Sequence, residues 1–445
     1  MASLWESISA SGPVAGVFRG RSHSVALQDL AGSSILGGNL ESFRGRSVLL
    51  ATREQLATAI ALLELDGVAR RLVLCTPDLT PEHVAAVSAT AEADCVLDSV
   101  AAVPVPQTFE RRTTETTEWV LLTSGTTGMP KLVAHSFESL GGGLPRQPVS
   151  TKPMVWSTFY DIRRYGGLQI YLRAVLSGCP LVLSSAGEPT REFLARAGAA
   201  GVTHISGTPS HWRRALMSGE TALIAPEYVR LSGEVADQTL LDNLRAAFPQ
   251  ARIAHAFAST EAGVAFDVND GLAGFPESLI GDSAGAVAMK VKDGTLWVRS
   301  QRSAMRYLGN TQTPIGSDDG YVDTGDLVEL TGGRFHFRGR KGGIINVGGM
   351  KVYPEEVESV LNADPRVRMS LVKARRNPLT GSLVVADVVL TESAGAADVS
   401  TADQIKSDLL SACRRTLSAH KVPALLRFVP ALELNSAGKL VRPGA

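Results

Sequence analysis

Short apolar segments alternate with amphipathic ones through most of the chain. Residues 47–51 and 71–75 are apolar runs of strand length, and residues 54–65 between them carry leucine and alanine at helical spacing. The same succession recurs at 165–184, where an amphipathic helix leads into a strand, and at 228–248, where a strand, a turn and a helix follow one another. Strands that alternate with helices are typical of a parallel sheet, so the pattern predicts an α/β fold for this part of the chain.

The pattern changes near Gly281. Four short segments of alternating polarity follow, and Gly332 with Gly333 marks a hairpin turn between the last two. They lie at 295–299, 321–323, 327–330 and 334–337. Alternation over so few residues is typical of half-buried antiparallel strands, so we predict a small antiparallel β subdomain after the parallel sheets.

A charged, glycine-rich junction at 338–343 precedes the last part of the chain. About a hundred residues are enough for an independent core, and this part has an α+β pattern of its own. Helices are expected at 354–361 and 402–417, and strands at 366–373, 383–390 and 425–429. We therefore predict an N-terminal domain of residues 1–340 and a smaller, mobile α+β domain of residues 341–445.

Composition excludes several classes of partner. The 44 basic residues balance the 44 acidic ones, so no net charge attracts nucleic acid or an anionic membrane. No apolar run is long enough to span a bilayer, and residues 1–21 do not have the pattern of a leader peptide. The four cysteines are far apart and sit mostly among apolar neighbours, as reduced cysteines of a cytosolic protein do. We expect a cytoplasmic protein without a membrane span or a nucleic-acid partner.

The segment with the most distinctive chemistry follows the apolar run from Trp119 to Leu122. Glycine and hydroxyl-bearing residues alone come directly after this run, and Lys131 follows closely. They are Thr123, Ser124, Gly125, Thr126, Thr127 and Gly128. Glycines let successive N–H groups turn toward one anion, while the hydroxyls and Lys131 add donors and positive charge. Such a loop suits a polyphosphate, and because its spacing differs from that of the common G-x-x-x-x-G-K-[ST] loop, a different nucleotide fold is expected.

Four polar segments, in this order, resemble motifs of the adenylate-forming (ANL) superfamily of acyl-CoA synthetases, peptide-synthetase adenylation domains and luciferases. Residues 123–131 resemble its phosphate loop, and the string Tyr-Val-Asp-Thr-Gly-Asp at 321–326 resembles its ribose-binding turn. Residues 339–341 with 347–352 resemble the hinge and the glycine-bearing loop after it, and residues 438–442 resemble the turn with the catalytic lysine. Each string alone is a weak match, but their common order makes the resemblance specific.

The resemblance implies an ATP site. The loop at 123–131 would hold the β- and γ-phosphates, and the carboxylate of Asp326 would accept hydrogen bonds from the ribose hydroxyls beside the guanidinium of Arg340. A turn-capping role is the alternative for Asp326. Lys439 would neutralise charge on the α-phosphate and on the attacking carboxylate. Without the resemblance, a lysine in this part of the chain would be assigned to the solvated surface.

Glu261, which follows Thr260, corresponds to the acidic residue that binds Mg²⁺ in the family, and both residues are expected at the catalytic site. Gly233-Glu234 fits the preceding turn, which in the family runs beside adenine. The family usually has Tyr and then Gly before the Thr-Glu pair, whereas this chain has Phe257-Ala258. Phe257 keeps a ring face for adenine but lacks the hydroxyl, so we expect stacking without that polar contact.

The acid pocket departs further from the family. Acyl- and aryl-CoA synthetases commonly have an aromatic residue and a His before the helix that corresponds to 165–178, and many amino-acid adenylation domains have an Asp there. This chain has no His in the segment and instead has Tyr160-Asp161 followed closely by two arginines. Asp161 is a candidate partner for a substrate ammonium, and pairing with its own arginines at the surface is an equal alternative. The candidate pocket residues are Tyr160, Asp161, Tyr165 and Gly207.

The resemblance implies an acid–thiol ligase that works in two steps. A carboxylic acid reacts with ATP to give an acyl-adenylate, and a thiol of CoA or of a carrier-protein phosphopantetheine then displaces AMP. Rotation of the small domain about Lys341 is expected between the steps, because Lys439 over the phosphates leaves no room for a thiol. The rotation would bring Gly348 and Gly349 to the site, where they let a pantetheine arm pass close to the backbone.

Two alternatives stay open. A stand-alone adenylation enzyme would load an amino or aryl acid onto a carrier protein. A catalytically retired nucleotide-binding protein would explain the altered Phe257-Ala258 and the missing His, although the retained Lys439, Glu261, Asp326 and Arg340 argue against it. The sequence indicates neither the acid nor the oligomeric state.

Overall fold

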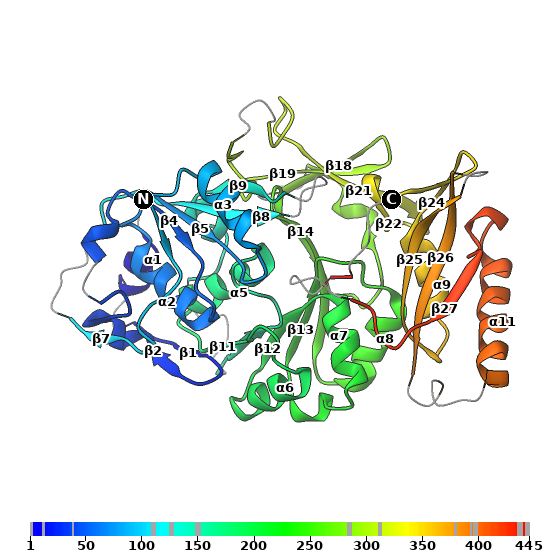
Figure 1. Cartoon of the computed structure of the whole chain (residues 1–445), viewed down its shortest axis with the longest axis horizontal. Coiled ribbons are helices and arrows are strands. Elements are labelled where there is room, and N and C mark those ends of the chain that lie inside the picture. The colour runs from blue at the N-terminus through cyan, green and yellow to red at the C-terminus, as the bar shows by residue number, and fades with distance from the viewer. Residues whose placement is uncertain are drawn as a thin grey trace.

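The computed structural model describes most of the chain. The described residues are 3–10, 14–37, 40–107, 113–123, 129–146, 153–282, 287–309, 314–377, 381–391, 394, 399–433 and 439–440. In Figure 1 the two large sheets with their helices occupy the left and centre, an antiparallel sheet lies above, and a small C-terminal domain lies at the right.

An eight-stranded sheet forms the larger half of the N-terminal part. In sheet order its strands are β15 (Gly263–Val268), β14 (Arg252–Ser259), β13 (Tyr228–Ser232), β12 (His204–Gly207), β10 (Trp156–Thr158), β11 (Leu181–Leu183), β1 (Val17–Arg19) and β2 (Ser24–Ala26). The strands from β14 to β1 pair in parallel, and β15 and β2 close the two edges antiparallel.

A six-stranded sheet forms the other half. Its order is β20 (Arg306–Tyr307), β9 (Lys131–His135), β8 (Glu118–Thr123), β5 (Arg71–Leu74), β4 (Ser47–Leu50) and β6 (Cys95–Leu97). The strands from β8 to β6 are parallel, and β9 and β20 add an antiparallel edge. The segment expected to bind phosphate therefore connects two adjacent antiparallel strands, with Thr123 paired to Lys131.

Helices join and cover these sheets. Residues of α2 (Gln55–Leu65) and α5 (Tyr165–Leu176) share one core cluster with strand residues of both sheets, such as Leu121 and Leu181. All but one residue of α2 are buried, which explains why this helix is apolar on almost every side. The amphipathic helices α6 (Thr190–Ala199), α7 (Pro209–Met217) and α8 (Gln238–Ala247) pack on the other face of the eight-stranded sheet. The remaining helices of this part are α1 (Leu4–Ser9), α3 (Pro81–Thr90) and α4 (Phe137–Gly141).

The antiparallel subdomain is a six-stranded sheet. Its order is β16 (Phe275–Pro276), β22 (Arg334–Arg340), β21 (Val322–Thr331), β19 (Thr295–Ser300), β18 (Val287–Lys292) and β17 (Gly281–Asp282). The predicted separation of 321–323 from 327–330 is wrong, because both belong to the single strand β21. Gly325 has φ +70° within this strand, and the register with β22 shifts at Leu327/Val328, so the alternation breaks without ending the strand.

The C-terminal part has its own core, made only of residues from Ile345 onward. Its elements are β23 (Ile345–Val347), β24 (Met350–Val352), α9 (Pro354–Asn362), β25 (Val367–Asn377), β26 (Gly381–Leu390), α11 (Val399–Thr416) and β27 (Leu425–Phe428). Parallel α/β sheets, an antiparallel β subdomain and a small α+β part confirm the predicted fold class. The predicted domain boundary at 340/341 directly precedes this core.

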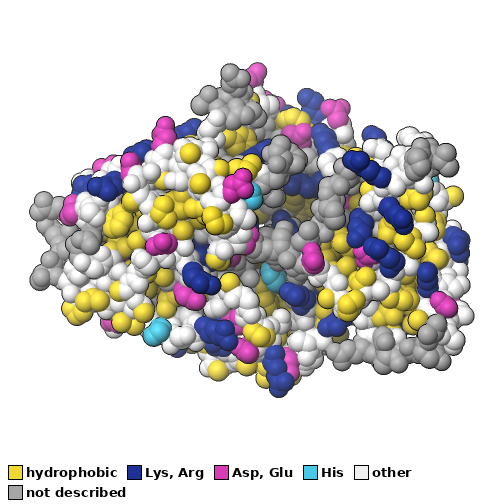
Figure 2. Space-filling model, in the orientation of Figure 1, with side chains coloured by type: hydrophobic (Ala, Val, Ile, Leu, Met, Phe, Trp, Pro, Cys, Tyr) yellow, Lys and Arg dark blue, Asp and Glu magenta, His cyan; other side chains and the backbone are white. Residues whose placement is uncertain are grey.

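The surface and the thiols agree with the composition. Acidic and basic side chains are interspersed over the N-terminal part in Figure 2, while several basic side chains gather over the C-terminal part. Within the described residues, no helix is long and apolar enough to cross a membrane. All four cysteines are free thiols, and three of them are buried.

Candidate active site

The expected site residues lie where strands of the eight-stranded sheet end. β12 ends at Gly207, β13 ends directly before Gly233, and β14 ends directly before Thr260. Because parallel strands have their carboxyl ends at one edge, these three turns are neighbours, and such edges are where α/β sheets bind ligands. The C-terminal segment, red in Figure 1, returns from the small domain toward α7 and β13, which brings the last lysine to the same edge.

Lys439 lies over the turn that follows β13. Gly233 has φ +88°, and a Cβ built on it would lie 3.2 Å from Cε of Lys439. The carboxylate of Glu234 links the two segments. Its Oε1 accepts from the N–H of Leu440 at 3.2 Å, and its Oε2 accepts from the N–H of Ser210 at 2.9 Å, in the first turn of α7. Glu234 thus fixes the lysine turn to the edge of the sheet.

The ammonium group of Lys439 lies among charged groups of both domains. Burial lowers the pKa of Lys439, the carboxylates of Glu234 and Asp326 act in the opposite direction, and Arg340 lowers it further. Burial also raises the pKa of Asp326, which Arg340 and Lys439 oppose. A cation and a carboxylate of the two domains therefore lie within electrostatic reach of each other, in surroundings where a polyanion would be held strongly.

The predicted ribose-binding residues face each other across two strands. Asp326 of β21 is paired in register with Arg340 of β22, and Nε of Arg340 lies 3.3 Å from Oδ1 of Asp326. Nη2 of Arg340 also donates to the carbonyl of Thr324 at 2.8 Å. The proposed hinge follows directly, and Nζ of Lys341 donates to Oδ2 of Asp323 at 3.0 Å.

The turn at Thr260-Glu261 is fixed by a histidine that the sequence analysis missed. His135, at the end of β9, is fully buried, and its Nε2 lies 2.8 Å from the carbonyl oxygen of Thr260. Because a carbonyl only accepts, Nε2 carries the proton, and Nδ1 accepts from the hydroxyl of Ser139 at 3.0 Å. Burial lowers the pKa of His135 to about 4, so the ring is neutral at pH 7. No short motif in a single chain marks this histidine.

We expect His135 to make folding pH-dependent. A pKa that falls from 6.5 to about 4 on folding corresponds to roughly 3 kcal/mol, present above pH 6.5 and lost as the pH falls toward 4. His135→Gln keeps an N–H donor for Thr260 but cannot titrate. Urea unfolding at pH 7 and pH 4.5 should show a smaller loss of stability at low pH in the variant. Equal losses in both proteins would contradict this assignment.

The side chain of Tyr307 connects Glu261 with the end of the phosphate-binding segment. Its hydroxyl lies 3.4 Å from Oε1 of Glu261, and Nζ of Lys131 lies 5.5 Å from the centre of its ring. The N–H of Ala304 donates to the carbonyl of Glu261 at 2.8 Å. These contacts place Lys131 over the ring of Tyr307 and Glu261 at its hydroxyl. Ser124, Gly125, Thr126, Thr127 and Gly128 lie outside the described residues, as do Gly438 and Arg442.

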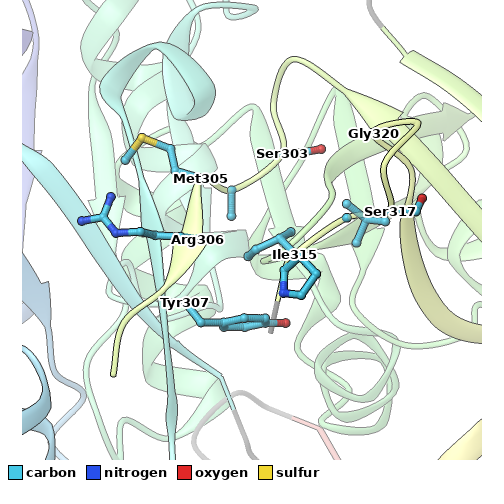
Figure 3. Close-up of a pocket in the computed structure, with 11 residues that line it drawn as sticks. Ser303, Met305, Arg306, Tyr307, Ile315, Ser317 and Gly320 are labelled. Atoms are coloured by element: carbon cyan, nitrogen blue, oxygen red, sulfur yellow. The ribbon is translucent and has the colours of Figure 1, made fainter. Parts of the chain in front are cut away.

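A cavity of about 380 Å³ lies beside this ring. Figure 3 shows Tyr307 and Met305 on one side and Ile315, Ser317 and Gly320 on the other. The cavity is bounded by the segment that holds Glu261 and by the start of β21, which leads to Asp326. It is therefore a space between the turn expected to bind Mg²⁺ and the strand expected to bind ribose.

Phe257 lies in an aromatic cluster. Its ring centre is 5.1 Å from that of Phe337 and 5.9 Å from that of Phe266, with interplanar angles of 17° and 23°. Ala258 follows at a register shift between β14 and β15. The ring is thus held by stacked phenylalanines, and its contact with adenine stays a prediction.

The candidate pocket residues divide into two groups. Tyr160 donates its hydroxyl to the carbonyl of Ser232 at 2.7 Å, and a Cβ on Gly207 would lie 2.8 Å from the ring of Phe159, so both line the end of β12 and β13. Asp161 instead pairs with Arg163 at 2.6 Å, and the Arg163 side chain is completely buried. This favours the ion-pair alternative for Asp161, although the pair lies inside the protein and not at the surface.

The two glycines expected beside the pantetheine arm lie away from the sheet edge. Gly348 and Gly349 form the exposed two-residue turn of the hairpin β23–β24, with φ +56° and +85°. Positive φ at both positions is what this type of hairpin turn requires. The hairpin would have to move to reach Lys439, as the predicted rotation demands.

The residues around Glu261 fit a magnesium ion bound mainly through substrate. Among the described residues, no group of three or more His, Cys, Asp and Glu side chains could hold a metal. Mg²⁺ usually keeps several waters and takes one or two carboxylates together with phosphate oxygens. A single carboxylate, that of Glu261, meets this requirement, and Glu261 is the residue that would hold the ion.

Two family models match this chain. The model of the AMP-binding enzyme matches residues 45–308, and that of the AMP-binding enzyme C-terminal domain matches residues 356–439. The chain belongs to the AMP-binding enzyme family. In this AMP-binding enzyme the first match contains Gly233 and Glu261, and the second ends at Lys439.

Individual relatives are similar to this AMP-binding enzyme at moderate identity. A 2-succinylbenzoate–CoA ligase of Salmonella typhimurium is 27% identical over 301 residues, which are 65% of this chain and 61% of that protein. A fatty acid–acyl-carrier-protein ligase of Mycobacterium marinum is 30% identical over 164 residues, which are 36% of this chain and 30% of that protein. This chain thus covers less than two thirds of the length of either relative.

The fold of this AMP-binding enzyme recurs in solved structures. An anthranilate CoA ligase in complex with anthranoyl-AMP superposes with a TM-score of 0.79 and 16% identity, over 99% of this chain and 95% of that chain. At this identity the likeness shows the shared fold alone.

Proposed function

We propose that this AMP-binding enzyme activates a carboxylic acid with ATP and passes the acyl group to a thiol. The observation that carries the proposal is the position of Lys439, held by Glu234 over the Gly233 turn and within electrostatic reach of Asp326. The attacking carboxylate and the α-phosphate are both anionic, so adenylation needs a cation between them. A lysine inserted by a second domain supplies that cation.

The first step forms an acyl-adenylate. A carboxylate oxygen of the acid attacks the α-phosphorus of ATP, the bond from that phosphorus to the bridging oxygen breaks, and pyrophosphate leaves with the electron pair. Lys439 neutralises charge at the α-phosphate, Asp326 with Arg340 holds the ribose, and the segment that ends at Lys131 holds the departing phosphates. Mg²⁺ bound at Glu261 would neutralise phosphate charge during this step.

The second step releases AMP. A thiol sulfur attacks the activated carbonyl carbon, the bond from that carbon to the phosphate oxygen breaks, and AMP takes the electron pair while the thiol proton passes to solvent. Lys439 occupies the edge where the thiol must enter, so rotation about Lys341 precedes this step. The exposed Gly348-Gly349 turn supports a role for these glycines at the site after rotation, because no side chain there obstructs a narrow arm.

Two acceptors fit this scheme. CoA is the acceptor named for the Salmonella relative, and a carrier protein is the acceptor named for the Mycobacterium one. We propose CoA first, because the longer match is to the CoA ligase. A comparison of thioester formation with free CoA and with a phosphopantetheinylated carrier protein separates the two.

The free cysteines further support a cytoplasmic location, where thiols stay reduced.

The proposal is tested by acid-dependent release of pyrophosphate. The protein with Mg-ATP is offered fatty, aryl, dicarboxylic and amino acids one at a time, and we expect at least one class to raise pyrophosphate release well above the rate without acid. Formation of the acyl-adenylate is checked by trapping it as a hydroxamate. Failure with every class would favour the retired nucleotide-binding alternative.

A further inference from the structure

One arginine interrupts a row of small side chains on the face of the eight-stranded sheet that carries α5. Arg230 of β13 lies in register between Ser206 of β12 and Ala254 of β14, and Ser232 follows two residues later on the same face. In the next row Ser232 is paired with Ala256 of β14. An arginine with such short neighbours is not packed on its sides by large side chains of the sheet.

Arg230 is buried but only partly paired. The residue is 5% exposed, and its Nε donates to Oδ1 of Asp267 at 2.8 Å. Its Nη2 is also buried, and within the part of the chain that the structure describes it has no hydrogen-bond partner. Buried guanidinium nitrogens are costly when they stay unpaired, so each such donor calls for an acceptor.

Positive charge exceeds negative charge around this group. Burial lowers the pKa of Arg173 on α5, and the charge of Arg230 lowers it further. The carboxylate of Asp267 raises the pKa of Arg173, so both Arg230 and Asp267 lie within electrostatic reach of Arg173. Arg302 adds a third positive charge to the same set. Among the described residues, neither Arg173 nor Arg302 forms an ion pair. Asp267 acts on both Arg173 and Arg230 but its side chain is 41% exposed, so positive charge is in excess at the buried Arg230 and favours binding of an anion.

The cluster lies directly below the proposed reaction centre. Ser232 precedes the Gly233 turn under Lys439, and Arg230 is two residues earlier on the same face, roughly 7 Å further along the strand. Tyr165, at the start of α5, lies near the same arginines, and burial raises the pKa of its hydroxyl to about 12. An acid whose carboxyl group is at Lys439 and whose body extends along β13 would meet Arg230.

We propose that the acid carries a second anionic group and that Arg230 is the residue that selects for it, through the N–H donors of Nη2. The inference rests on the proposed function, because it takes the reacting carboxylate to be at Lys439. It narrows the substrate class to dicarboxylic acids and their dianionic equivalents. Arg173 and Arg302 strengthen the positive field around that second group.

Matched acids test the proposal. Benzoate is compared with isophthalate, and hexanoate with adipate, as substrates for pyrophosphate release by the wild-type protein and by Arg230→Met. We expect the diacid of each pair to have the higher kcat/KM in the wild type. The variant should lose about a hundredfold in kcat/KM with diacids and less than about threefold with monoacids, because only diacids present a charge to the guanidinium.

A matched control separates specificity from folding. Arg252→Met removes an exposed arginine of β14 that lies 4.6 Å above the ring of Tyr228 and next to it in register, and we expect unchanged selectivity. Equal losses with monoacids and diacids in Arg230→Met would show a structural role and overturn the inference while leaving the proposed function intact. A wild-type preference for monoacids would overturn it as well.

Binding supplies a readout that does not depend on turnover. The rise in Tm on adding isophthalate or benzoate is measured for the wild type and Arg230→Met. A rise with isophthalate that exceeds that with benzoate and is lost in the variant supports the inference. If this occurs without pyrophosphate release from any acid, the proposed function fails and the anion site stands; the absence of any difference between the acids overturns the site.

Discussion

Lys439→Ala should lower acid-dependent pyrophosphate release by about a thousandfold, the loss expected when one preorganised charge at a reacting group is removed. The lysine lies over the Gly233 turn, and the contact between Glu234 and Leu440 holds its segment there. Two other cations act on Lys439, and both are engaged: Arg340 with Asp326 and Thr324, and Arg164 with Asp78. The variant should therefore keep the ATP site while losing the first step.

The second step distinguishes this role from a general loss of structure. Chemically prepared acyl-adenylate, offered with CoA, should yield thioester in Lys439→Ala at close to the wild-type rate, because in the proposed mechanism Lys439 leaves the site before the thiol attacks. A loss of equal size in both steps would contradict the assignment. Lys421→Ala is the matched control, because it removes a lysine of the same domain that pairs with Glu356, and pyrophosphate release should be nearly unchanged.

Periodicity along the chain was enough to predict the layers. Both faces of the central strands are buried, so strands such as 71–74 and 228–232 are rich in apolar residues. The helices between strands carry apolar residues at helical spacing. The prediction failed at two places. Gly325 interrupts the alternation in β21 without ending the strand. Helix α7 was not predicted, although Thr208 and Pro209 are ordinary signals for the start of a helix.

The site was predictable only as far as short motifs reach. The turns at 233–234 and 260–261 are short local motifs. They were assigned to the site because they resemble motifs that occur in the same order in a known family. The contacts that join them are not local: Glu234 and Leu440 are 206 positions apart, and His135 and Thr260 are 125 positions apart. The sequence left the pairing of Asp161 with its own arginines open beside a ligand role, and neither the burial of the Asp161–Arg163 pair nor the excess of charge around Arg230 is recorded in one-dimensional spacing.

Lys341→Pro should have the opposite effect to Lys439→Ala. Arg340 has φ −105° and ψ 148°, which is the extended region that a residue before proline prefers, and Lys341 begins a short 3₁₀ turn, where proline is tolerated. The substitution is therefore compatible with the observed arrangement of the two domains, in which Lys439 is at the site. Pyrophosphate release should stay within about threefold of the wild type, since the exposed ion pair to Asp323 that is lost contributes little.

Thioester formation should fall by about a hundredfold in the same variant, because a thiol held away from the carbonyl by a few ångströms reacts poorly. Proline fixes φ at roughly −65°, a value compatible with the 3₁₀ turn that Lys341 begins, so the proposed rotation that withdraws Lys439 and brings the Gly348-Gly349 turn forward would be blocked. Lys341→Ala removes the same ion pair without restricting the backbone and should form thioester at nearly the wild-type rate. If Lys341→Pro makes thioester as fast as Lys341→Ala, the backbone at 341 is not the hinge, and the two steps share one arrangement of the domains.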